Sequence, residues 1–183
     1  MASDFAIRHA AHIVHRGGII AYPTDTIYGL GCDPFNIDAI ERLNRIKQRP
    51  ASKYFILLAG ELAQIRPLLA ISDAEAQTLC DTDEPTSWIV PAAAAAPPWL
   101  TDADNNLTVR LCNQEDVRRL CERLGHAIIS TSANLAGHRP AQNTLQLHQR
   151  FQCEVDKILV SDKPLRGKAS RIIRLRDHRI IRQ

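Results

Sequence analysis

The sequence predicts an α/β fold built on a mixed β-sheet, and three observations lead to this prediction. Segments with apolar residues at helical spacing alternate along the chain with short apolar runs of strand length. No internal repeat interrupts this alternation. The last two apolar segments, 171–175 and 179–182, flank Arg176-Asp177-His178 as the arms of a hairpin do, so part of the sheet is antiparallel.

The first half of the chain contains four helical segments and two strands. A helix capped by Ser3 or Asp4 precedes the strand 19–22. A second helix begins near Ile37 and must end before Pro50, because the residue that precedes a proline disfavours helical geometry. The remaining elements of this half are a buried strand over 55–58 and short helices over 61–69 and 73–79.

The second half continues the alternation. Two strands, 87–90 and 107–111, enclose the segment 92–98, which has the composition of a rim loop more than that of a domain linker. We therefore expect one domain over residues 1–183. The other predicted elements are a helix over 116–124 closed by Gly125, a strand over 127–129, a helix over 145–151 and a strand over 158–160.

Composition excludes several classes of protein. The 183 residues are 45% hydrophobic and 23% charged, which excludes a disordered or fibrous chain. No apolar run reaches the roughly 18 to 20 residues of a membrane span, and the N-terminus lacks the order of a secretory signal, so a cytoplasmic protein without membrane partners is expected. The five cysteines are widely spaced and are interpreted as reduced, small core residues rather than disulfide or zinc ligands.

Charge is unevenly distributed along the chain. The net charge is +3, but from Lys157 onward nine Lys or Arg stand against two Asp, a local charge of +7 that leaves −4 for residues 1–156. A basic C-terminal segment suits a polyanion such as nucleic acid or a nucleotide triphosphate. A solvated basic face is the alternative.

The first cluster of candidate functional residues is PTDTIYGLGCD at positions 23–33, which is rich in hydroxyl side chains and glycine. Such composition is typical of a loop that forms a site. Its Gly29-x-Gly31 is not a dinucleotide fingerprint, because Pro34 stands where the third glycine is required. Taken alone, this glycine pair favours a turn.

The second cluster is KQRP at 47–50, followed by Ser52 and Lys53. The proline constrains the chain just past the helix, so that Lys47, Arg49 and Lys53 can converge on one anion such as a phosphate. The alternative is a basic helix end that complements the helix dipole.

The third cluster is STSANLAG at 130–137, where an apolar strand runs into small polar side chains. Hydroxyls, an amide and backbone N–H groups at one sheet edge suit oxyanions and a ribose, whereas capping and turn formation is the alternative. No His or Asp is placed to activate one of these serines as a nucleophile, and G-x-S-x-G is absent. His9, His12 and His15 lack a nearby carboxylate or cysteine and are interpreted as a solvated helix face, so no metal ligand is assigned.

In this order and with these gaps, the three clusters resemble the motifs of the YrdC/TsaC family, and the resemblance covers essentially the whole chain in the single-domain bacterial form. It implies a YrdC-like domain, a twisted mixed sheet with flanking helices and a concave basic surface. It also implies threonylcarbamoyl-AMP synthase activity: L-threonine, bicarbonate or CO2, and ATP with Mg2+ give threonylcarbamoyl adenylate and pyrophosphate. The intermediate supplies the group that a tRNA-modifying protein complex places on tRNA adenosine 37.

The resemblance also assigns site residues. Lys47 and Arg49 match the family's K-x-R, which faces the ATP phosphates, and are the expected catalytic residues. The full set expected at ATP is Lys47, Arg49, Lys53, Asn106, Ser132, Asn134 and Arg182. The set expected at L-threonine is Thr26, Arg110, Ser130 and Ser170. Positioning and charge neutralisation dominate such a reaction, because the carbamate of threonine itself attacks phosphorus and no protein nucleophile is needed.

Two segments depart from the family's pattern. Glu84, within the segment 82–87, replaces a glycine and is expected to add negative charge near the triphosphate, and Arg171 stands where a small hydroxyl or an acid is common. Two alternatives therefore stay open. One is a nucleotide-binding paralogue without synthase activity. The other is an RNA-binding, ribosome-maturation factor that holds tRNA or structured RNA by its backbone, since 5% aromatic residues disfavour stacking on single strands.

Overall fold

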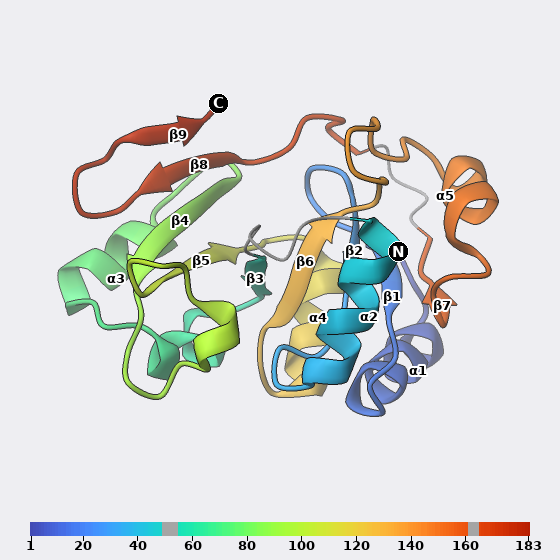
Figure 1. The fold of residues 1–183 in the computed structure, drawn as a ribbon, viewed down its shortest axis with the longest axis horizontal. Helices are drawn as coiled ribbons and strands as arrows, with labels where there is room; N and C mark the ends of the chain where they lie inside the picture. Colours follow the sequence, from blue (N-terminus) through green and yellow to red (C-terminus); the bar gives the residue numbers. More distant parts are fainter. Residues whose placement is uncertain (49–54, 161–164) are drawn as a thin grey trace.

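A computed structural model describes residues 1–48, 55–160 and 165–183, and in this part of the chain nine strands form one sheet (Figure 1). The strand order is β7-β1-β2-β6-β3-β5-β4-β8-β9. The strands are β1 (Ile20–Pro23), β2 (Tyr28–Gly31), β3 (Ile56–Ala59), β4 (Thr86–Pro91), β5 (Asn106–Leu111), β6 (Ile128–Ser132), β7 (Lys157–Ile158), β8 (Arg171–Arg174) and β9 (Ile180–Arg182). The α-helices are α1 (Asp4–His15), α2 (Ile37–Lys47), α3 (Asp73–Cys80), α4 (Glu115–Leu124) and α5 (Thr144–Phe151).

The sheet is mixed, which confirms the predicted fold class. β1 pairs with β7, β3 with β5, and β4 with β8 in parallel, whereas the other neighbouring strands are antiparallel. The C-terminal hairpin is confirmed by the antiparallel pair β8 and β9. In Figure 1 this hairpin lies at the end of the sheet far from α1 and α5.

Helices cover both faces of the sheet, and the two-residue period of each strand decides which side chains they meet. On one face, α1 and α4 pack over Tyr22, Leu58 and Ile128. On the other face, α2 and α3 join a larger apolar cluster that contains Leu57 and Ile129, the strand neighbours of Leu58 and Ile128. Figure 1 shows α2 and α4 on opposite sides of β6.

Helix ends follow the local sequence. Ser3 caps α1 by accepting a hydrogen bond from the Ala6 N–H, and Asn36 caps α2 by accepting one from the Ala39 N–H. Gly125 ends α4 with a left-handed φ of 74°, as its position in the sequence predicts. In the described part of the chain, no helix combines the length and apolarity needed to cross a membrane.

Some predicted elements have different bounds in the structure. The segment 23–33 was expected to be a loop, but it contains β2, which pairs with β1 and β6. The strand predicted over 127–129 extends to Ser132, and the strand predicted over 158–160 is the shorter β7. The helix predicted over 61–69 is two short 3-10 helices, Leu62–Gln64 and Arg66–Leu68, because Pro67 cannot donate the backbone bond that a continuing α-helix requires.

The cysteine prediction is correct for three of the five residues. Cys32, Cys112 and Cys121 are buried free thiols, but Cys80 and Cys153 are exposed on the surface. In α3 the neighbouring Leu79 takes the buried position, and Cys153 lies in the turn after α5 ends at Phe151. Burial raises the pKa of both Cys32 and Cys121 to about 12.

These two thiols should make the protein less stable in alkali. The folded state keeps both protons, whereas the unfolded chain releases them above about pH 9, so stability falls as the pH rises through the window from 9 to 12. Between pH 8 and pH 10 we expect a loss of about 1.4 kcal/mol for each thiol in the free energy of urea unfolding. Cys121→Ala should lessen this pH dependence, whereas Cys80→Ser, at an exposed position, should not. Equal pH dependence in all three proteins would contradict the expectation.

Candidate functional site

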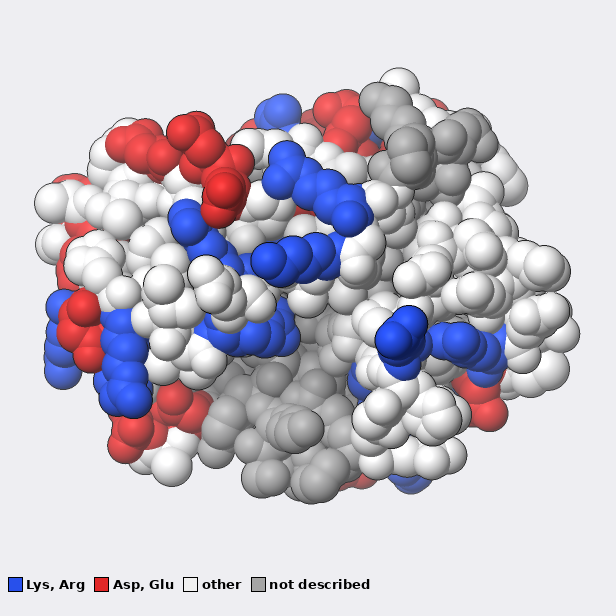
Figure 2. All heavy atoms as spheres, turned by 90° about the horizontal axis from the view of Figure 1, so that it is seen from above, with Lys and Arg blue, Asp and Glu red and all other residues white. Residues whose placement is uncertain are grey.

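A cleft of about 770 Å³ opens where the strands run beyond α1 and α4. These helices cover Leu58 and Ile128, whereas Ile56 and Ser130, two residues along the same strands and on the same face, line the cleft. The volume is typical of a small-molecule site. Figure 2 looks onto the side of the molecule where these strand ends lie, and Lys and Arg side chains gather around its central hollow.

The first and third sequence clusters meet in this cleft because β2 pairs with β6, with Gly29 opposite Ser132. Both glycines of β2 face strand β6 closely. A Cβ atom on Gly31 would collide with the carbonyl oxygen of Ile129, and one on Gly29 would lie 3.1 Å from Ser130 Oγ. The glycine pair therefore permits close strand approach and does not form the expected turn.

Lys47 brings the second cluster to the same place. It is the last residue of α2, only 3% exposed, and its ammonium donates to the carbonyl oxygen of Ser132 and to both oxygens of Asn134, at 2.6 Å to the carbonyl and 2.9 Å to Oδ1. The backbone N–H of Ala136 donates to the carbonyl of Lys47 at 3.1 Å. Lys47 thus fastens the loop after β6 to the end of α2, in addition to lining the cleft.

Asn134 organises that loop from within. Its Oδ1 accepts from Lys47 and from the hydroxyl of Ser132, and its Nδ2 donates to the carbonyls of Leu135 (2.9 Å) and His138 (2.7 Å). Every polar atom of this amide side chain is therefore engaged inside the loop. Asn134 lines the cleft as the sequence predicts, but its contacts hold the loop in shape.

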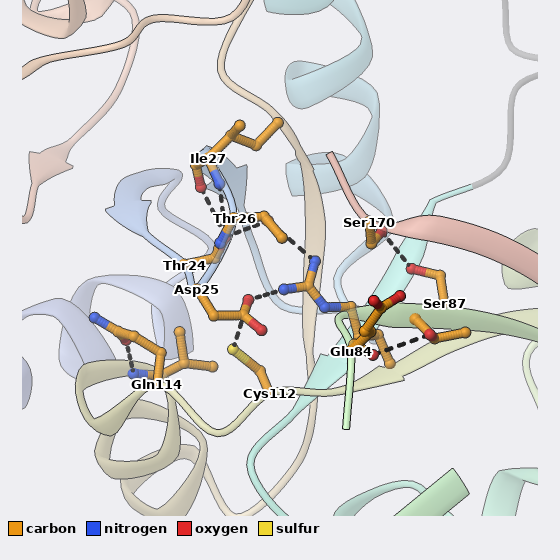
Figure 3. A network of polar contacts seen from close by, with 12 residues as sticks. Thr24, Asp25, Thr26, Ile27, Glu84, Ser87, Cys112, Gln114 and Ser170 are labelled. Carbon is orange, nitrogen blue, oxygen red and sulfur yellow. Dashed lines mark hydrogen bonds and ion pairs between the residues drawn. The ribbon is translucent and has the colours of Figure 1, made fainter. Parts of the chain in front are cut away.

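Arg110 is the most buried cation of the described cleft besides Lys47, with 5% of its surface exposed. Its Nη1 donates to Thr26 Oγ1 at 3.2 Å, and its Nη2 forms an ion pair with Asp25 Oδ1 (Figure 3). Burial lowers the pKa of the Arg110 guanidinium from its ordinary value. Thr26 and Arg110, both predicted at threonine, are thus brought into direct contact.

Ser170 and Arg182 form a second group on the opposite wall. The hydroxyls of Ser170 and Ser87 lie 2.9 Å apart and both side chains are buried (Figure 3). Arg182 Nη2 donates to the Ser170 carbonyl at 2.8 Å, and burial lowers the pKa of the Arg182 guanidinium. The hairpin of β8 and β9 brings these predicted residues together.

The two departures from the family's pattern contact each other. Arg171 Nη1 lies 3.2 Å from Glu84 Oε2, and Arg171 Nε donates to Thr86 Oγ1 at 2.7 Å. The Glu84 carboxylate was expected to add charge near a triphosphate, but Arg171 balances it, and neither residue is among those that line the cleft. The parallel pairing of β4 and β8, with Thr86 opposite Arg171, is the reason.

The remaining predicted residues have different positions. Ser130 and Ser132 line the cleft. Asn106 is not among the described lining residues: its Nδ2 donates to the Asp102 carboxylate at 3.1 Å, in the turn that precedes β5. Arg49 and Lys53 lie outside the described residues.

Asp25 and Ser87 are contacts of the site that the motif-based assignment missed. Asp25 stands between Thr24 and Thr26, and a carboxylate within that hydroxyl-rich segment was a signal that could have been used. The signal for Ser87 is that it keeps the hydroxyl of the family's motif within the segment 82–87, but its partner Ser170, 83 residues away in the sequence, could not be read from it.

The chemistry of the cleft is that of an anion-binding site. Cations from α2, β5 and β9 face hydroxyls from the β1–β2 loop, β6 and the residue before β8. Among the described residues there is no group of three His, Cys, Asp or Glu side chains that could hold a metal ion. Such a cleft can bind and orient anionic small molecules by charge and hydrogen bonds.

Comparison with known proteins gives consistent matches. The family model named for Sua5, YciO and YrdC, described as "Telomere recombination", matches residues 12–183. A threonylcarbamoyl-AMP synthase from Nitrosococcus oceani is 40% identical over 178 residues, covering 96% of this chain and 95% of the relative.

Solved structures have the same fold. Escherichia coli YciO superimposes with a TM-score of 0.87 at 27% identity, covering 99% of this chain and 90% of that protein. Sua5 from P. abyssi in complex with L-threonine superimposes with a TM-score of 0.85 at 26% identity, covering 94% of this chain and 51% of that one.

Proposed function

Because this chain belongs to the Sua5/YciO/YrdC family, we propose that it synthesises threonylcarbamoyl-AMP from L-threonine, bicarbonate or CO2, and ATP, with release of pyrophosphate. The observation that carries the proposal is the single cleft in which Thr26, Lys47 and Ser130, one from each sequence cluster, come together. Relatives of nearly the same length carry that activity in their names.

We assign the part of the cleft around Arg110 to L-threonine. The guanidinium of Arg110 suits the threonine carboxylate, and Thr26, Ser130 and Ser170 offer hydroxyls to the amino acid. The Sua5 structure that binds L-threonine has this fold and supports the assignment.

We assign the other part to ATP, bound as its Mg2+ complex. Ser132 and Arg182 line the cleft and suit ribose and phosphate oxygens, and Lys47 and Asn134 shape the loop beside them. Arg49 and Lys53 complete the proposed ATP-binding set on the strength of their sequence positions alone. Asn106, which the motifs also assign to ATP, would join the set only by exchanging its bond to Asp102 for one to the nucleotide. The ion enters with the triphosphate, and we assign it no protein ligand.

The proposed reaction has two steps. The amine of threonine adds to CO2 and loses a proton, which gives a carbamate. One carbamate oxygen then forms a bond to the α-phosphorus of ATP while the bond to the bridging oxygen breaks and pyrophosphate leaves. The protein holds the two anionic reactants close and neutralises their charge, with Lys47 and Arg49 as the proposed catalytic residues.

The product places this chain in tRNA modification, and we propose that it acts in the cytoplasm as one domain over residues 1–183. A tRNA-modifying protein complex would accept the adenylate and transfer the threonylcarbamoyl group to adenosine 37. Binding of tRNA or structured RNA by the Lys and Arg side chains in Figure 2 is a further proposal, supported by the charge of the C-terminal segment.

Pyrophosphate release tests the proposed function. With ATP, L-threonine and bicarbonate all present, we expect release that falls to background when either threonine or bicarbonate is left out. Release that does not depend on threonine, or its absence under all conditions, would instead favour a nucleotide-binding paralogue or an RNA-binding factor. The same protein sample with L-valine in place of L-threonine serves as the control for general amino-acid effects.

A further inference from the structure

Arg110 carries its charge in a buried position, where a charge that has no partner destabilises the folded state. It is 5% exposed, it stands on the interior strand β5 between β3 and β4, and it lines the cleft. A buried guanidinium that has no counter-charge destabilises the fold strongly. The residues that neutralise Arg110 therefore decide whether and how it can face a ligand.

The β1–β2 loop supplies both partners of the guanidinium. Asp25 forms the ion pair with Nη2, and Thr26 accepts from Nη1 at 3.2 Å. Nε is buried and has neither a hydrogen bond nor an ion pair among the described residues. The loop thus engages the two terminal nitrogens of the guanidinium and leaves the Nε–H without an acceptor among the described residues, in a side chain that lines the cleft.

Asp25 is itself held in place. Cys112, which lies two residues beyond Arg110 and is fully buried, donates from Sγ to Asp25 Oδ1 at 3.3 Å. Burial raises the pKa of the Cys112 thiol, so the group keeps its proton and stays a donor at neutral pH. The hydroxyl oxygens of Thr24 and Thr26 lie 2.9 Å apart, and this hydrogen bond fixes the two residues on either side of Asp25.

We propose that Asp25 is a positioning residue that orients Arg110, so that its Nε edge faces the cleft and receives a carboxylate ligand. Where that ligand is named as L-threonine, the proposal rests on the proposed function. Asp25 is not among the residues that line the cleft, so it acts through Arg110. An arginine side chain has many rotamers, and fixing one of them before the ligand arrives strengthens binding.

Three variants test this role. Asp25→Asn keeps the shape of the side chain and removes its charge, and Asp25→Glu keeps the charge. Asp156→Asn is the matched control, because Asp156 pairs with Arg42 at 2.6 Å and neither residue lines the cleft. The ligand-free proteins are compared by the NMR signal of the Arg110 Nε–H, assigned through Arg110→Lys, and binding of L-threonine, L-threoninamide and ATP is measured by calorimetry.

We expect Asp25→Asn to lose or broaden the Nε–H signal and to bind L-threonine at least about tenfold more weakly. Its preference for L-threonine over L-threoninamide should fall, while ATP affinity stays within about threefold. Asp25→Glu should recover most of the signal and the affinity, and Asp156→Asn should keep both.

An unchanged signal and an unchanged preference in Asp25→Asn would overturn the proposal. If the natural chain binds no L-threonine, the proposed function fails, and the Nε–H signal still decides the positioning role. Should Asp25→Asn not fold, Cys112→Ala, which removes only the thiol donor to Asp25, carries the same comparison with an expected loss of about threefold.

Discussion

Arg110→Ala should raise the Kd for L-threonine by about 10- to 150-fold and leave the Kd for ATP within about threefold. A charge-assisted contact with the threonine carboxylate contributes roughly 1.5 to 3 kcal/mol, which corresponds to that range. The fold should survive, because the carboxylate that loses its partner, Asp25, is 21% exposed and can be hydrated. Calorimetry with each substrate alone measures both affinities.

The control for Arg110→Ala is Arg42→Ala, which also removes an arginine from an ion pair but away from the cleft. It should bind both substrates normally. Arg49→Ala should show the converse defect, with weaker ATP binding and normal threonine binding. Equal loss of both ligands in folded Arg110→Ala and Arg49→Ala would refute the separation of the two substrate regions.

The Lys47→Met variant should be at least about 100-fold less active than the natural protein. Without any ligand present, its free energy of unfolding should be lower by about 3 kcal/mol. The ammonium donates to three oxygens of Ser132 and Asn134 from a position 3% exposed, and methionine would remove the donor to the two carbonyl oxygens and one of the two donors to Asn134 Oδ1. Urea unfolding of the ligand-free protein and pyrophosphate release measure the two effects.

The ligand-free measurement separates two roles of Lys47. If the lysine only contacts phosphate, Lys47→Met should lose activity while its stability without ATP remains normal. If it fastens the loop after β6, both quantities fall together. Lys157→Met, in the edge strand β7, is the matched control and should change neither by much.

Local sequence was sufficient for most elements of the fold. Helix caps such as Ser3 and Asn36, and the closing Gly125, act within a few residues of where they stand, so α1, α2 and α4 could be placed from their own segments. β2 could not. Its Gly29 and Gly31 have low strand propensity, and only the close approach of β6, about a hundred residues later, makes glycine the required residue there.

The candidate site shows the same division. The structure places Thr26, Lys47, Arg110 and the serines of β6, all of which the motifs single out, in one cleft. The partners of these residues were not predictable, because Asp25 and Arg110 are joined by the sheet and not by sequence proximity. Asn106 was assigned by its position in a motif, yet a neighbour four residues away, Asp102, engages its amide.

The contact between Glu84 and Arg171 has a consequence for how this sequence changes over generations. Arg171 stands between Ser170 and Ile172, which both line the cleft, and it balances the one carboxylate of the pair, whose unbalanced charge would repel bound anions. Glu84 is tolerable near the cleft because Arg171 is present, whereas an unpaired Arg171 would attract the same anions. A lineage that loses arginine at 171 should therefore also lose the carboxylate at 84, but the reverse does not follow.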